Sequence, residues 1–104
     1  MNEERIGKLK ELLEQDPNDS FSRYALALEY AGQGEQQIAV SLLQEVIRRD
    51  PLYVAAYQQL GYNYSSLGRV EDARAILSEG IAKATEAGDN HARSEMQEAL
   101  DDLD

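Results

Sequence analysis

Apolar residues recur along the chain at the three- and four-residue spacing of amphipathic helices, and no segment reads convincingly as a strand. Ser20 is a candidate N-terminal cap for the second of these helices, and Asp89 or Asn90 for the last. We therefore expect an all-α protein. The pattern predicts six helices, at about residues 3–15, 20–32, 35–49, 54–66, 70–86 and 90–103.

The pattern repeats itself after 34 residues. Asp16-Pro17 recurs as Asp50-Pro51, Tyr30 as Tyr64 and Gly34 as Gly68, and Ala27 aligns with Gly61. A single offset without gaps indicates that a two-helix unit is duplicated within the chain. Further pairs at the same shift are Leu26 and Leu60, Ala39 and Ala73, Leu43 and Leu77, Glu45 and Glu79, and Ile47 and Ile81.

Gly61 lies in the middle of a predicted helix, where glycine is unfavourable by ~1 kcal/mol relative to alanine. We expect small side chains at Gly61 and Ala73 to let two antiparallel helices approach closely, with the rings of Tyr57 and Tyr64 packed around the contact. Burial of a tyrosine or leucine contributes ~1.5–3 kcal/mol, which outweighs the cost of the glycine. Gly61 is therefore interpreted as a spacer.

These residues resemble the tetratricopeptide repeat, a 34-residue helix–turn–helix unit. In residues 54–87 the matching positions are Tyr57, Leu60, Gly61, Tyr64, Ala73, Leu77 and Gly80, and Thr85 replaces the closing proline. In residues 20–53 they are Arg23, Leu26, Ala27, Tyr30, Ala39, Leu43, Val46 and Pro51. Arg23 departs from the family's aromatic residue, and Val46 is larger than the usual small residue.

The resemblance implies a right-handed α-solenoid of antiparallel helix hairpins, forming one domain over residues 1–104. Terminal repeats otherwise expose an apolar side, so flanking helices are expected at both ends, the last with its acids pointing outward. The expected parts are an N-terminal flanking helix at 3–15, repeats at 20–53 and 54–87, and a C-terminal capping helix at 88–104.

Domains of this family are generally protein-interaction modules, whose first helices line a concave groove that holds a peptide. The resemblance implies an adaptor or scaffold without catalytic activity, and its groove positions carry no formal charge, which suits a peptide with hydrophobic side chains. The candidate groove residues are Phe21, Tyr24, Leu28, Ala55, Gln58, Tyr62 and Ser65.

Other readings of these groove residues remain open. The rings of Phe21, Tyr24 and Tyr62 could instead pack between repeats, or the same apolar face could join copies of a homo-oligomerising structural protein through weak self-association. Some family members clamp a chaperone's terminal carboxylate with basic side chains. Those places hold Tyr24, Leu28, Gln58 and Tyr62, so a chaperone-tail receptor is not expected.

The chain has a net charge of −10, concentrated towards its ends. Residues 86–104 hold seven acids and one base, whereas residues 54–85 are balanced. We therefore expect no binding to nucleic acid, because phosphate binding requires a basic patch. Solubility, a basic partner or a salt-rich cytoplasm would each explain the acidity.

Candidate chemistry is sparse. There is no cysteine, and the single histidine, His91, stands beside Asp89 and Asn90 as expected of a surface residue at a helix start. Adjacent acids such as Glu71-Asp72 point in different directions on a helix and do not form a paired site. We therefore expect no enzyme, cofactor or metal site. The N-terminal segment has no apolar signal-peptide core and no run is long enough to span a membrane, so we expect a cytoplasmic protein.

Overall fold

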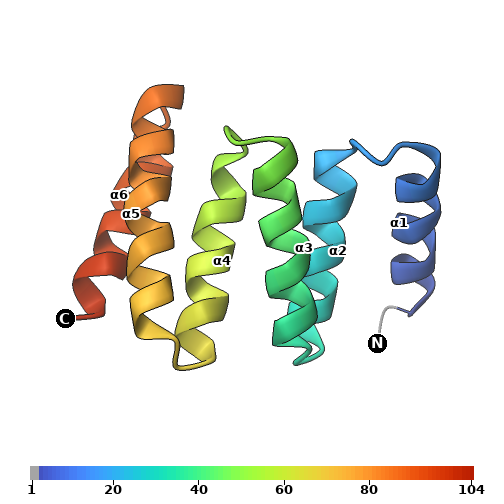
Figure 1. Ribbon diagram of the computed structural model, residues 1–104, viewed down its shortest axis with the longest axis horizontal. Coiled ribbons are helices and arrows are strands. Elements are labelled where there is room, and N and C mark those ends of the chain that lie inside the picture. The colour runs from blue at the N-terminus through green and yellow to red at the C-terminus, as the bar shows by residue number, and fades with distance from the viewer. Residues whose placement is uncertain (1–2) are drawn as a thin grey trace.

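The computed structural model describes residues 3–104. Over that range the protein forms six α-helices and no strand. The all-α prediction is confirmed, and the observed helix bounds lie within one residue of the expected ones. The helices are α1 (Glu3–Gln15), α2 (Ser20–Gly32), α3 (Gln36–Arg49), α4 (Val54–Ser66), α5 (Val70–Ala87) and α6 (Asn90–Asp102) (Figure 1).

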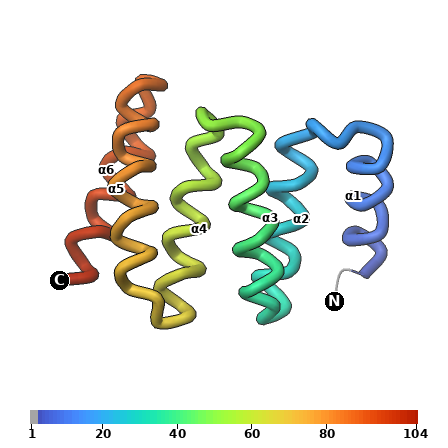
Figure 2. The backbone as a smooth tube through the Cα atoms, viewed as in Figure 1, coloured from blue at the N-terminus to red at the C-terminus, as the bar shows by residue number. Residues whose placement is uncertain are grey.

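The helices form a row in which each packs against the next along the chain. Helices α1 and α6 lie at opposite ends of this row (Figure 2). Besides the contacts between successive helices, α4 also contacts α6. The fold is therefore an α-solenoid of antiparallel hairpins, in which each unit is stabilised mainly by its neighbours.

Aspartates cap the N-termini of α2 and α6. The Asp19 carboxylate accepts the backbone N–H of Ser22 at 3.0 Å and its hydroxyl at 2.6 Å, and these bonds lower the pKa of Asp19. Asp89 accepts the N–H of Ala92 at 3.0 Å. The expectation of Ser20 as the cap is wrong by one residue, because Ser20 is already the first helical residue and Asp19 has the extended backbone of a cap.

Equivalent glycines form the turns inside the two hairpins. Gly34 and Gly68 have φ angles of +83° and +75°, in the left-handed region that glycine enters without steric cost. Each lies two residues beyond the end of a first helix, Gly34 between α2 and α3 and Gly68 between α4 and α5. The recurrence of glycine after 34 residues therefore reflects the same turn geometry made twice.

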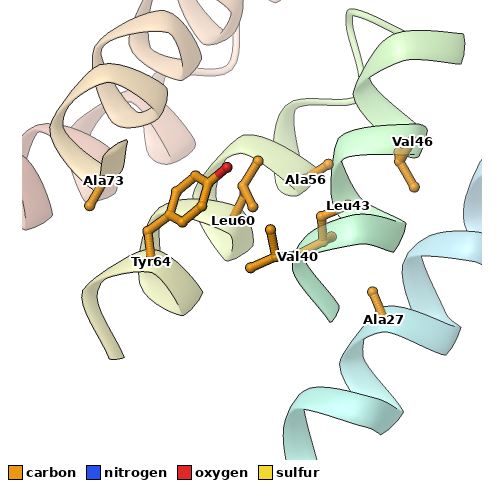
Figure 3. Close-up of a cluster of buried hydrophobic side chains, with 8 residues drawn as sticks. All are labelled: Ala27, Val40, Leu43, Val46, Ala56, Leu60, Tyr64 and Ala73. Atoms are coloured by element: carbon orange, nitrogen blue, oxygen red, sulfur yellow. The ribbon is translucent and has the colours of Figure 1, made fainter. Parts of the chain in front are cut away.

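The largest core cluster joins the two hairpins. It draws side chains from α2, α3, α4 and α5 (Figure 3). The hydroxyl of Tyr64, in this cluster, accepts the side-chain N–H of Gln44 at 2.9 Å, so a polar bond also joins α3 to α4. Its buried members are Ala27, Val40, Leu43, Val46, Ala56, Leu60, Tyr64 and Ala73.

Two smaller clusters attach the flanking helices. One joins α1 to α2 through Ile6, Leu9, Ala25 and Leu26. The other joins α4, α5 and α6 through Val54, Tyr57, Leu77, Ala84, Ala92 and Met96. Both end helices are thus held by apolar side chains.

Gly61 is a spacer, but for a different neighbour than expected. A Cβ atom at Gly61 would lie 2.5 Å from Cδ2 and 2.7 Å from Cγ of Leu77. The glycine therefore makes room for the buried Leu77 side chain, not for the backbone around Ala73, which packs in the larger cluster. Gly80 acts in the same way, since a Cβ there would lie 2.6 Å from Sδ of Met96 and 2.7 Å from Cβ of Tyr57.

Candidate functional site

The candidate groove residues lie on α2 and α4, the first helices of the two hairpins, and differ in exposure. The Phe21 residue is 66% exposed, Tyr62 40% and Leu28 38%. Ser65 is exposed as well, whereas Ala55 and Gln58 are half-buried. Large apolar side chains thus reach solvent from both first helices.

Tyr24 belongs to the packing between hairpins. Its ring lies 5.3 Å from that of Tyr53, centroid to centroid, at a tilt of 47°, and it packs against the larger core cluster. Burial raises the pKa of Tyr24, an effect partly offset by a hydrogen bond with Gln59. Tyr24 therefore packs between the hairpins, as one of the open readings had it, whereas Phe21 and Tyr62 are exposed.

Helix α6 adds a group of carboxylates beside Tyr62. The side-chain amide of Gln58 donates to the Tyr62 hydroxyl at 2.7 Å and to Oε1 of Glu95 at 3.1 Å, which links α4 to α6. A pocket of about 270 Å³, here called the α4–α6 pocket, opens between the two helices. It is lined by Tyr62, Glu95, Glu98, Ala99 and Asp102.

The acids of the last helix, which were expected to point outward, are exposed, and three of them also line the pocket beside Tyr62. Glu95, Glu98 and Asp102 follow one another at three- and four-residue spacing, so they share one side of α6. That side faces Tyr62, because the buried Ala92 and Met96 hold the other side of α6 against the core. The helical spacing of these acids was visible in the sequence, but the rotation of α6 was not.

The carboxylates of the α4–α6 pocket differ in their partners. Glu95 accepts from Gln58 and lies 3.3 Å from Nε2 of His91, one turn earlier on α6. Within residues 3–104, the side chains of Glu98 and Asp102 make neither a hydrogen bond nor an ion pair. Two of the three acids are therefore open to an added cation.

Ala55 lies in a different hollow from Tyr62. A second pocket, of about 410 Å³, forms where the α3–α4 turn meets the end of α5 and the start of α6. Ala55 is therefore separated from the α4–α6 pocket, although both were expected in one groove. Its lining residues are Leu52, Tyr53, Val54, Ala55, Ala87 and Asp89.

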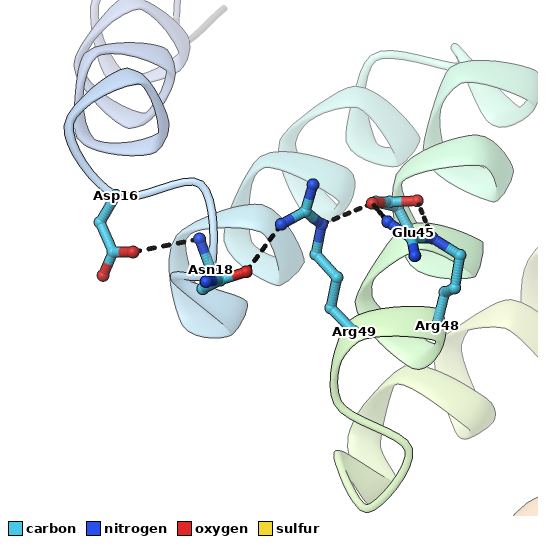
Figure 4. A network of polar contacts seen from close by, with 5 residues as sticks. All are labelled: Asp16, Asn18, Glu45, Arg48 and Arg49. Carbon is cyan, nitrogen blue, oxygen red and sulfur yellow. Dashed lines mark hydrogen bonds and ion pairs between the residues drawn. The ribbon is translucent and has the colours of Figure 1, made fainter.

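A polar network ties the loop between α1 and α2 to the end of α3 (Figure 4). The Glu45 carboxylate accepts from Nε of Arg48 at 2.9 Å and from Nε of Arg49 at 2.5 Å, and Nη1 of Arg49 donates to Oδ1 of Asn18 at 2.7 Å. The two arginines lower the pKa of Glu45 to about 2. We interpret this network as structural, because its groups satisfy one another.

Two further findings concern other kinds of site. Across the described residues, no three or more histidine, aspartate or glutamate side chains gather in a way that could hold a metal ion. None of the helices in residues 3–104 combines the length and apolar character that crossing a membrane requires.

Comparison with known proteins decides the family. Two sequence profiles, each described as the tetratricopeptide repeat, match residues 30–94 and residues 1–54. The chain belongs to the tetratricopeptide repeat (TPR) family. The division into two repeats with flanking helices remains an interpretation of the 34-residue period.

Proteins similar to this chain are also TPR proteins. The chain is 30% identical over 99 residues to the TPR repeat-containing protein PA0015 of Pseudomonas aeruginosa, covering 95% of this chain and 94% of the relative. Among solved structures, a TPR domain protein from Salinibacter ruber superposes with a TM-score of 0.79 at 39% identity, covering 85% of this chain and 89% of that one.

A third similarity concerns the fold alone. The TPR2B domain of yeast Sti1, solved in its complex with pHsp70, superposes with a TM-score of 0.89 at 17% identity, covering 94% of this chain and 78% of that one. TPR domains are a protein-interaction fold and not a catalytic one. The family therefore places this chain among protein-interaction modules.

Proposed function

We propose that this TPR chain is an adaptor or scaffold that binds a peptide segment of a partner protein across α2, α4 and α6. The observation that carries the proposal is the exposure of Phe21, Leu28 and Tyr62 on the first helices of successive hairpins. Large apolar side chains that reach solvent on neighbouring elements are typical of association surfaces. The absence of cysteine is compatible with a reducing compartment, so we propose the cytoplasm as its place of action.

The relation to Sti1 supports the kind of ligand but not its identity. That TPR domain is found in a complex with pHsp70, on a fold that this chain shares. Tyr24, Leu28, Gln58 and Tyr62 occupy the places where chaperone-tail receptors have basic side chains. We therefore propose a partner segment other than a chaperone's carboxylate terminus.

The proposal is tested by affinity capture with a matched pair of double variants. Phe21→Ala with Tyr62→Ala removes exposed rings from α2 and α4, and Ile38→Ala with Val70→Ala removes exposed apolar side chains from α3 and α5. A partner recovered with the wild type and with the Ile38 and Val70 variant, but lost with the Phe21 and Tyr62 variant, supports the proposal. Binding of the purified partner, measured by calorimetry with all three proteins, then confirms a direct interaction.

Other outcomes would contradict it. If both double variants retain every captured protein, the rings of α2 and α4 do not bind a partner. If the wild type sediments as a dimer at micromolar concentration and only the Phe21 and Tyr62 variant is monomeric, the same face joins two copies of the chain. Thermal melting followed by circular dichroism establishes that each variant is folded before its binding is compared.

A further inference from the structure

We propose that the α4–α6 pocket receives an arginine or lysine side chain of the bound peptide. This inference rests on the proposed function and specifies its partner as a segment with an apolar residue near a basic one. The pocket joins the exposed Tyr62 ring to the carboxylates of Glu95, Glu98 and Asp102. A cation can lie against the face of such a ring while it pairs with carboxylates.

The lining chemistry favours a cation over an apolar side chain. Three of the five lining residues are acids, and none is a base. Glu98 and Asp102 have no partner within residues 3–104, and neighbouring like charges are stabilised when a counter-charge arrives. An arginine fits this arrangement well, because its planar guanidinium both stacks on aromatic rings and bonds carboxylates through two N–H groups.

Basic side chains on the adjacent helix α5 are engaged elsewhere. Arg74 contacts Asp104 and Glu71, Arg69 contacts Asp72, and Lys83 contacts Glu86. The pocket is therefore not neutralised by these side chains of the folded chain. Charge complementarity then points to a cation supplied by the partner.

The position of the pocket explains why the basic residue should accompany an apolar one. Tyr62 belongs both to the pocket and to the proposed binding surface, which continues on α2 with Leu28 and Phe21. A peptide that covers these apolar side chains therefore brings its next residues towards the carboxylates of α6. Apolar contacts would supply binding area, and the basic residue would set the direction of the peptide.

The pocket can be tested directly with arginine. We would titrate the full chain, labelled with nitrogen-15, with N-acetyl-arginine amide and with N-acetyl-citrulline amide, its neutral isostere, and follow the amide signals by NMR. Arginine is expected to shift Tyr62, Glu95, Glu98 and Asp102 at millimolar concentration, and citrulline to bind at least about 5-fold more weakly. Raising the salt from about 50 to 300 mM should weaken arginine binding and leave citrulline binding unchanged.

A matched pair of variants separates the pocket from general acidity. Glu98→Gln with Asp102→Asn should weaken arginine binding by about 5-fold or more, whereas Glu79→Gln with Asp101→Asn, which changes the net charge equally outside the pocket, should leave it within about 2-fold. Equal loss in both variants would show attraction to the whole acidic chain and overturn the inference. Equal binding of arginine and citrulline, or no shift at the pocket with either, would also overturn it.

Two results distinguish this inference from the proposed function. If a captured partner depends on Phe21 and Tyr62 but binds the Glu98 and Asp102 variant as tightly as the wild type, the surface is confirmed and the basic anchor is wrong. If pocket signals move with protein concentration in the absence of any probe, a second copy of the chain fills the pocket, and the inference fails in favour of self-association.

Discussion

The α2–α3 and α4–α5 hairpins share one sequence spacing but fill equivalent places with different chemistry. The place of Tyr57 in the second hairpin is held by Arg23 in the first, and both residues are buried, with 1% and 8% of their surface exposed. The Tyr57 hydroxyl donates to the carbonyl of Pro51 at 2.7 Å, whereas Nη1 of Arg23 is buried without a hydrogen-bond partner. Arg23 can replace a ring there because its long apolar stem covers surface as an aromatic side chain does.

The small residues of the two hairpins differ for a related reason. Val46 is fully buried at the place equivalent to Gly80, so the first hairpin has room for a branched side chain. In the second hairpin Tyr57 and Met96 occupy that room, and only glycine fits between them. The comparison teaches that a repeat spacing selects where small residues stand, while the neighbouring side chains set how small they must be.

Among substitutions that test this comparison, Tyr57→Ala should have the largest effect on stability. Loss of a fully buried ring leaves a cavity and removes the bond to Pro51, so the free energy of unfolding should fall by about 3–5 kcal/mol. Urea unfolding followed by circular dichroism measures it. Tyr62→Ala is the matched control, because the same side chain is lost from an exposed position and stability should change little. Equal losses for the two variants would mean that Tyr62 also belongs to the core.

The Gly80→Val substitution introduces into the second hairpin the valine that the first hairpin holds at the equivalent position, Val46. The added side chain would collide with Met96 and with Cβ of Tyr57, which lies close to the backbone. We therefore expect the free energy of unfolding to fall by about 3 kcal/mol, at the upper end of the range for overpacking. The same unfolding measurement applies. Gly7→Ala, in α1 with open space around the glycine, should instead stabilise by up to ~1 kcal/mol. A Gly80→Val protein as stable as the wild type would contradict the packing of α5 against α6.

Arg23→Met should stabilise the first hairpin by about 1 kcal/mol, because it removes a buried group that lacks a hydrogen-bond partner and keeps an apolar stem. Burial and the neighbouring Arg49 lower the pKa of Arg23, so its surroundings disfavour the charged form. Arg23→Lys, which keeps the charge, is the control and should not increase the free energy of unfolding. Equilibrium unfolding compares the variants; a clear loss of stability in Arg23→Met would show that attraction to Glu45 and Asp19 outweighs the burial of the charge.

Glu45→Gln should have the smallest effect and a distinctive pH dependence. The pKa of Glu45 is lowered from 4.5 to about 2 in the folded chain, so its contribution to stability is present above about pH 4.5 and is lost as the pH falls towards 2. The difference in Tm between wild type and Glu45→Gln should therefore shrink over that window. In an Arg48→Gln, Arg49→Gln background the difference should be small at every pH, and Glu79→Gln, at the equivalent place on α5, should also change Tm little.

Much of the fold could be predicted because helices and turns depend on local spacing. The 34-residue period placed Gly34 and Gly68 at equivalent turns, and the helix bounds followed from apolar spacing and from Pro17 and Pro51. The cap of α2 was assigned to Ser20 instead of Asp19, because both are good capping residues and only the backbone angle separates them. Errors of this kind are confined to helix ends.

The candidate site was harder to predict, because it depends on how helices are rotated against one another. Phe21 and Tyr24 lie on the same side of α2, three residues apart, yet Tyr24 packs on Tyr53 and Phe21 is exposed. The acids of α6 had a clear helical spacing, but their position beside Tyr62 depended on how Met96 packs over Gly80. No spacing within one helix contains that information.

The sequence by itself determined the helices, their turns and the order of large and small residues, because each depends on neighbours a few positions away along the chain. Only the tertiary structure decided which side chains meet: that Leu77 fills the space at Gly61, and that Glu95, Glu98 and Asp102 lie beside Tyr62. The physical reason is that close packing between helices sets their rotation, and the fit of buried side chains from separate segments settles that rotation.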